Sequence, residues 1–117
     1  LDKITILEIK SERMTDPEKV ANVRVELALL KETWDGAVTE DDVIRGLHDQ
    51  LKKINEALWE IEDDIRDKER VKEFDQRFIE LARAVYFTND RRSKVKKDLN
   101  LHLGSQIVEE KSYQDYD

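Results

Sequence analysis

The sequence predicts an all-α protein, a helical bundle built on one long antiparallel helix hairpin. Two features of the composition point there: 42% of the 117 residues are charged, and the chain holds only 3 Gly and 1 Pro. Such a composition is typical of long helices with solvated outer faces rather than of a β-sandwich or barrel. The third feature is a sustained heptad pattern, which disordered chains of similar charge lack.

The heptad pattern occupies the second half of the chain, where seam residues alternate three and four positions apart. The first stripe is Ile44, Leu47, Leu51, Ile54, Leu58, Ile61 and Ile65, and the second is Phe74, Phe78, Leu81, Val85, Thr88, Arg92, Val95 and Leu99. This spacing gives each helix a narrow seam of the coiled-coil type, which must be buried against another helix. We therefore expect helices over about 40–70 and 74–103, joined by a tight turn near 70–74.

The first element is a helix over about 1–14, with apolar residues on two sides. Its projection places Leu1, Ile4, Leu7 and Met14 on one side, with Ile6 and Ile9 nearly opposite. A strand is the alternative, but the charged residues do not alternate cleanly enough for one. Thr15 or Asp16 followed by Pro17 predicts a helix stop and a capped restart.

The second element is a helix over about 17–34, closed by the helix-ending pair Asp35-Gly36. One face carries Val20, Val23, Leu27, Leu30 and Trp34, whereas Val25 and Leu29 lie on the other side. We expect one face of each N-terminal helix to cover the seam of the hairpin. The second apolar face of each would then be exposed, which predicts a homodimer formed through these two helices.

The ends of the two long helices follow from capping residues. Thr39 and Asp42 have the spacing of a capping box at the start of the third helix. Gly104 is the expected residue after the end of the fourth helix. These signals predict a single helical domain over 1–104 and a C-terminal tail over 105–117.

Charge and residue usage exclude several classes of protein. The net charge of −7 makes nucleic acid an unsuitable partner. The longest uninterrupted apolar run, Leu27 to Leu30, is too short to span a bilayer, and no secretory leader is visible. With no cysteine there is no disulfide, thiol nucleophile or thiolate metal site. We take the cytoplasm as the default compartment and expect no cofactor.

A polar break interrupts the second seam at Thr88 and Arg92. Antiparallel pairing of the long helices places this break opposite about 52–57, with Glu56 the nearest partner for Arg92. One interpretation is a polar layer that fixes helix register. The other is a site for a ligand or partner, built from Lys53, Asn55, Glu56, Asn89, Asp90, Arg91 and Arg92.

Charge is also segregated along the hairpin. A basic pole consists of Lys52, Lys53, Arg91, Arg92, Lys94, Lys96 and Lys97, whereas acidic residues dominate nearer the turn. Such a pole suits an anionic small molecule or an acidic protein surface. The alternative is an ordinary solvated face with ion pairs one helical turn apart.

Two patterns raise the question of metal binding. The acidic string over 60–64 has a spacing that can hold a divalent cation, as in all-α nucleotide pyrophosphohydrolases, if a second acidic helix faces it. The candidates for that second helix are Glu8, Glu12 and Glu26. His48 and His102 fall close together in the same pairing and could bind zinc. Both patterns arise easily in a helical chain with 28 acidic residues, so we assign no metal.

Several strings resemble a family of small bacterial proteins of unknown function. They are LDKITILEIK (1–10), VANVR (20–24), LWEIEDDIR (58–66), ELARAVYFTNDRR (80–92) and LGSQIVEEKSY (103–113). The resemblance covers nearly the whole chain and implies an all-helical cytoplasmic protein, with a loose link to surface polysaccharide synthesis. It supplies no catalytic residues.

A weaker resemblance relates residues 2–13 to the first helix of the all-helical chorismate mutases. It implies that Arg92 and Lys53 bind a dicarboxylate, but the long first helix of those enzymes is missing here.

The sequence thus favours a non-enzymatic protein-interaction or scaffolding module. The alternative is a metal-dependent all-α nucleotide pyrophosphohydrolase, or another enzyme acting on a phosphorylated or carboxylated small molecule.

Overall fold

The chain folds into four helices joined by short connections. A computed structural model describes the backbone of residues 1–115 and the side chains of residues 1–104. The helices are α1 (Asp2–Arg13), α2 (Pro17–Ala37), α3 (Asp42–Arg70) and α4 (Gln76–Asp115). The predicted all-α class is confirmed.

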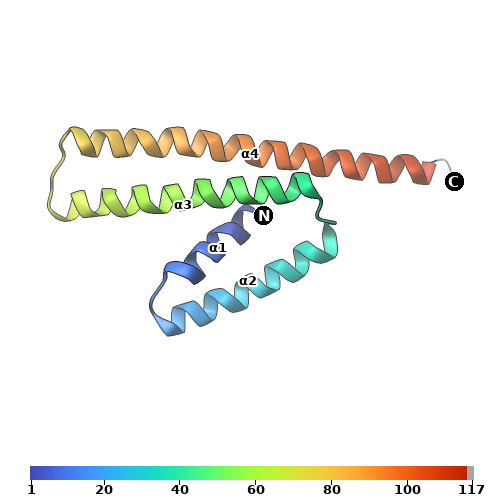
Figure 1. Cartoon of the computed structure of the whole chain (residues 1–117), viewed down its shortest axis with the longest axis horizontal. Helices are drawn as coiled ribbons and strands as arrows, with labels where there is room; N and C mark the ends of the chain where they lie inside the picture. Colours follow the sequence, from blue (N-terminus) through green and yellow to red (C-terminus); the bar gives the residue numbers. More distant parts are fainter. Residues whose placement is uncertain (116–117) are drawn as a thin grey trace.

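The two long helices, α3 and α4, lie side by side and run antiparallel (Figure 1). Their seam forms the main core, in which Ile44, Leu47 and Leu51 pack against Val95 and Leu99. All five are buried, as the heptad spacing predicts. The predicted hairpin is therefore confirmed.

The turn between α3 and α4 is short and held by charges. Lys72 adopts a left-handed backbone conformation with φ of 55°. The Lys68 ammonium lies 3.0 Å from the carboxylates of both Glu73 and Asp75. Asp75 also accepts a hydrogen bond from the Phe78 backbone N–H, which caps the start of α4. The turn falls within a residue of its predicted position.

Helix α1 lies against the hairpin and buries Ile4, Leu7 and Ile9 fully and Ile6 in part. Ile4 and Leu7 are buried as expected, but Ile9, expected on an exposed second face with Ile6, is only 1% exposed. That expectation is wrong because α1 is enclosed by the molecule itself, between α3 on one side and α2 on the other (Figure 1).

Helix α2 forms an outer layer that packs on α1 and not on the hairpin seam. The expectation that both N-terminal helices cover the seam is therefore wrong for α2, none of whose residues is buried. The three-residue connection 14–16 turns the chain back along α1, which lies between α2 and α3. Only the C-terminal part of α2 reaches the core of the hairpin, against which the half-buried Trp34 packs.

The helix ends correct several capping assignments. Asp16 caps α2 as predicted, but α3 is capped by Asp41, whose carboxylate accepts from the Ile44 N–H at 2.8 Å, and not by Thr39. Helix α2 continues through Gly36, and α4 continues through Gly104 to Asp115. Neither glycine adopts the left-handed conformation of a helix-ending residue. A helical glycine costs only about 1 kcal/mol relative to alanine, which a long helix tolerates.

None of the described helices is both long and apolar enough to cross a membrane.

Candidate functional site

The polar break in the seam is a closed cluster of four residues from three helices, which we call the Asp2 cluster. Arg92 binds the Asp2 carboxylate through two nitrogens: Nε donates to Oδ1 at 3.0 Å, and Nη2 donates to Oδ2. Asn55 donates its amide hydrogens to Asp2 Oδ1 at 3.0 Å and to the Thr5 hydroxyl at 2.8 Å. Thr5 in turn donates to the Asp2 backbone carbonyl at 2.7 Å. The cluster thus ties α1 to both helices of the hairpin.

The electrostatics of the Asp2 cluster favour the charged form of its carboxyl group. Burial alone would raise the pKa of Asp2. The hydrogen bonds from Arg92 and Asn55, with the charges of Arg92 and Lys96, outweigh burial and lower that pKa below its usual value. Among the described residues, no buried side-chain nitrogen or oxygen lacks a hydrogen-bond partner. A fully satisfied polar layer of this kind suits the fixing of helix register.

The expected pairing of Arg92 with Glu56 is wrong. Glu56 lies 3.9 Å from Arg13 at the other end of α1, whereas Arg92 pairs with Asp2. The pairing of α3 with α4 alone omits α1, whose first turn inserts a carboxylate at the level of Arg92. The pairing of the two long helices therefore predicted correctly that Arg92 needs a carboxylate partner, but it did not predict that this partner is Asp2.

The structure brings together only two of the seven predicted site residues, Asn55 and Arg92, which both bind Asp2. Lys53, Asp90 and Arg91 are exposed, and Glu56 and Asn89 are half-buried without joining the Asp2 cluster. Lys53, which the chorismate mutase resemblance groups with Arg92 as a dicarboxylate ligand, lies outside the Asp2 cluster. Sequence reasoning missed Asp2 and Thr5, for which the only signal is the polar-rich string at 1–10.

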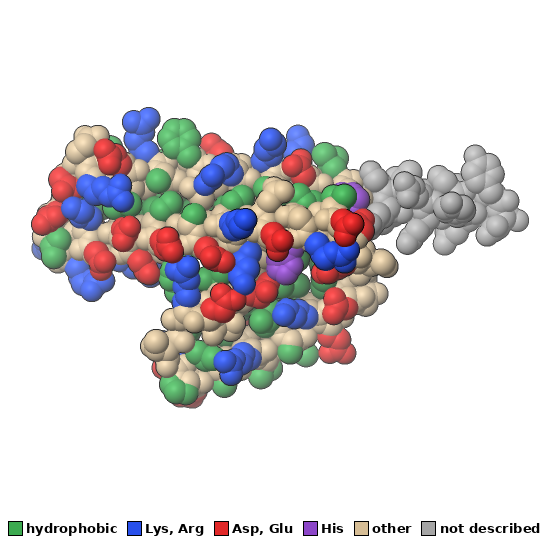
Figure 2. All heavy atoms as spheres, viewed as in Figure 1, with side chains coloured by type: hydrophobic (Ala, Val, Ile, Leu, Met, Phe, Trp, Pro, Cys, Tyr) green, Lys and Arg blue, Asp and Glu red, His purple; other side chains and the backbone are tan. Residues whose placement is uncertain are grey.

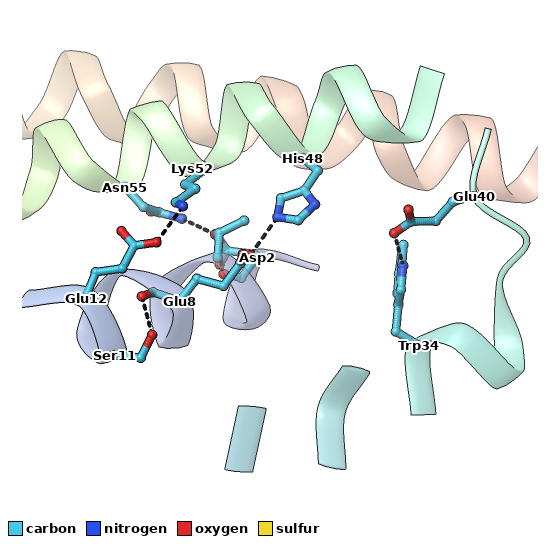
Figure 3. A network of polar contacts seen from close by, with 10 residues as sticks. Asp2, Glu8, Ser11, Glu12, Trp34, Glu40, His48, Lys52 and Asn55 are labelled. Carbon is cyan, nitrogen blue, oxygen red and sulfur yellow. Dashed lines mark hydrogen bonds and ion pairs between the residues drawn. The ribbon is translucent and has the colours of Figure 1, made fainter. Parts of the chain in front are cut away.

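A second row of polar contacts joins α1 to α3, as Figure 3 shows. Glu8 Oε1 lies 2.6 Å from His48 Nε2, and Lys52 donates to Glu12 at 2.7 Å. The hydrogen bond raises the pKa of Lys52. Because Glu8 and Glu12 are engaged in this way, they do not form the second acidic face that a two-helix cation site requires.

In the described contacts the two histidines do not share a carboxylate, as a zinc site between them would require. His48 contacts Glu8, and His102 Nε2 lies 2.7 Å from Asp41 Oδ2 at the start of α3. Within the part of the chain whose side chains are described, no three His, Asp or Glu residues converge as metal ligands.

A cleft of about 360 Å³ opens beside the Asp2 cluster, between α1, the second half of α3, and α4. It is lined by Ile6, Ile9, Lys10, Asn55, Leu58, Trp59, Glu62, Asp63, Arg66 and Arg92. Its lining combines an apolar floor and one indole ring with three cations and two carboxylates. We call this the α1–α3 cleft.

Three helices also present apolar side chains to solvent, α3 only through Val43. On α2, Val25 is 62% and Leu29 60% exposed, and green side chains are visible along the outer edge of α2 in Figure 2. On α4, Tyr86 and Phe87 are exposed, and the Arg83 guanidinium lies 6.0 Å from the centre of the Phe87 ring. Phe87 thus contacts a cation of its own helix.

Comparison with known proteins gives a family but no function. No curated protein and no solved structure shows significant similarity to the chain. The model of a family of unknown function, DUF6165, matches residues 1–116. The resemblance to a small all-helical family of unknown function is thereby confirmed, and the chain belongs to the family DUF6165.

Proposed function

We propose that this protein is a non-enzymatic interaction module that assembles as a homodimer through the outer face of α2. The single observation that carries this proposal is the exposed pair Val25 and Leu29, one helical turn apart on a helix without a buried residue. Exposed Ala21 extends the same stripe by one turn before Val25, and exposed Ala28 lies between Val25 and Leu29 along the chain. Small residues there allow a second helix to approach closely.

A second copy of the chain fits this face better than a partner of one charge sign. The stripe is flanked by both signs of charge, with Lys19, Arg24 and Lys31 against Glu18, Glu26, Glu32 and Asp35. A nearly balanced flank does not select a strongly acidic or basic partner. Two copies of one apolar stripe can pack face to face around a two-fold axis, which is the commonest arrangement of homo-oligomers.

The experiment is light scattering coupled to size exclusion, at high micromolar chain concentration. The wild-type chain should elute with twice its mass of 13.9 kDa. Because each copy carries a net charge of −7, added salt should strengthen the association by screening repulsion. A wild-type monomer under these conditions would refute the homodimer.

Paired variants locate the interface. V25E together with L29E should give a monomer of unchanged helix content by circular dichroism, since neither side chain supports the core. The matched control is Y86E together with F87E, which places the same charges on the exposed face of α4 and should leave the dimer intact. Dissociation by the control pair, or persistence of the dimer in the α2 pair, would contradict an α2 interface.

The alternative of a metal-dependent hydrolase gains no support from the described carboxylates. Glu8 and Glu12 contact His48 and Lys52, and Glu26 lies 3.1 Å from Lys3. The link to surface polysaccharide synthesis stays a prediction from the family resemblance.

A further inference from the structure

We propose that the α1–α3 cleft binds a small organic anion, a molecule with a flat apolar body and one phosphate or carboxylate group. The proposal is independent of the homodimer, because the cleft lies on the opposite side of α1 from the exposed stripe of α2. The first support is shape. Three helices contribute to the lining, and a volume of about 360 Å³ falls within the range of small-molecule sites.

The apolar part of the lining suits a flat ring. Ile6 and Ile9 come from α1, and Leu58 and Trp59 from the facing turn of α3. Trp59 is half-buried, and its indole N–H donates to no described residue, whereas the indole of the other tryptophan, Trp34, donates to Glu40 at 3.1 Å. An indole face beside aliphatic side chains is a favourable surface for stacking an aromatic or heteroaromatic body.

The charged part of the lining suits an anionic group. Lys10 is half-buried and forms no ion pair with any described residue. Arg92 lines the cleft and uses Nε and Nη2 on Asp2, so the hydrogens of its Nη1 are bound by no described residue. Because Asp2 holds the guanidinium in place, this donor is fixed in position before any ligand binds.

The two carboxylates of the cleft, Glu62 and Asp63, are outnumbered by its three cations, and neither lies within ion-pair distance of Lys10. Glu62 and Asp63 each lie 3.9 Å from Arg66, which belongs to the same stretch of α3. The lining thus has an ion-paired wall on α3, and its other two cations are Lys10 on α1 and Arg92 on α4. An anionic ligand would be oriented by Lys10 and Arg92, with its body against Trp59.

The test uses four probes: 1-naphthyl phosphate, 1-naphthoate, the uncharged 2-naphthol, and inorganic phosphate. Binding is followed by the indole N–H resonances of a nitrogen-15-labelled chain, with W34F to assign the Trp59 signal. We expect saturable movement of the Trp59 signal with both naphthyl anions and little with 2-naphthol or inorganic phosphate. The ratio of the two naphthyl affinities shows whether the site prefers phosphate or carboxylate.

Lys10→Gln should weaken the binding of the preferred naphthyl anion about tenfold, the effect of losing one charge-assisted hydrogen bond. The matched control is Lys19→Gln, which removes the same charge from the exposed surface of α2 and should change the affinity less than twofold. Circular dichroism shows that both variants keep the fold.

Three results would overturn the proposal. The first is the absence of saturable binding of either naphthyl anion at millimolar concentration. The second is equal binding of 2-naphthol, which would leave only an apolar contact. The third is equal weakening by Lys10→Gln and Lys19→Gln, which would reduce the effect to the overall charge of the chain.

Discussion

Removal of the Arg92 guanidinium tests whether the Asp2 cluster holds α1 on the hairpin. The variant Arg92→Met keeps most of the side-chain length but leaves the Asp2 carboxylate without its two charge-assisted hydrogen bonds. The side chains of this pair are 28% and 16% exposed, between a surface pair and a buried one. Surface pairs contribute about 0–1 kcal/mol, and breaking a buried pair costs about 3–5 kcal/mol.

The expected loss of unfolding free energy is about 2 kcal/mol, between those limits, because Asn55 and Lys96 still partner the carboxylate after the change. Urea unfolding followed by far-ultraviolet circular dichroism measures it at pH 7, at one fixed chain concentration so that association does not alter the comparison. Arg91→Met is the matched control, since Arg91 is exposed. Its cost should stay within about 0.5 kcal/mol.

A double-mutant cycle with Asp2→Ala separates the pair from other effects. If the two residues act together, the double variant should lose about 1.5 kcal/mol less than the sum of the single losses. Additivity within about 0.5 kcal/mol, or a loss for Arg92→Met no greater than for Arg91→Met, would refute the argument that this pair fastens α1.

Three further predictions concern stability measured by the same unfolding assay. Because the pKa of Asp2 is lowered on folding, the stability that its carboxylate contributes is fully present above the unfolded pKa near 3.8 and is lost as pH falls through the folded pKa. The difference in unfolding free energy between wild type and the Arg92→Met variant should therefore shrink below about pH 4. Gly46→Ala and Gly104→Ala should each raise the unfolding free energy by about 0.5–1 kcal/mol, because both glycines are helical and an added Cβ meets nothing within 4 Å; a loss at Gly104 would contradict a helix that continues there. Asp41→Ala should cost about 1 kcal/mol or more as the loss of a helix cap, whereas Thr39→Ala should cost almost nothing.

The hairpin of α3 and α4 could be predicted because its evidence is local and periodic. Each seam residue is related to the next by one helical turn, so the register of apolar residues alone indicates which side is buried. Ile44 and Leu51 follow this pattern and are fully buried. No contact between distant parts of the chain was needed for the prediction.

The placement of α1 and α2 could not be predicted, because both helices carry aliphatic residues on two sides. Ile9 and Leu29 are alike in size and hydrophobicity, yet one is 1% and the other 60% exposed. The difference depends on which neighbour covers each face. Helical projection of one segment does not contain that information.

In the candidate site, too, the local features could be predicted and the contacts between distant segments could not. A cation in an apolar seam signals a missing anion, and the sequence identified this for Arg92. The anion itself, Asp2, lies 90 residues away and in a helix outside the hairpin. The α1–α3 cleft could not be predicted either, because it exists only where α1 meets α3.

The bond between Asp2 and Arg92 has a consequence for the growing chain on the ribosome. Asp2 and Arg92 are 90 positions apart, and at synthesis rates of about 5–20 residues per second this stretch takes about 5–18 s to make. Early in that interval, before α3 has emerged, the buried residues Ile4 and Leu7 have only α2 available to cover them. We therefore expect the nascent first half to be the stage at which this protein is most exposed to aggregation and to chaperones, and folding to be completed only after α4 has emerged.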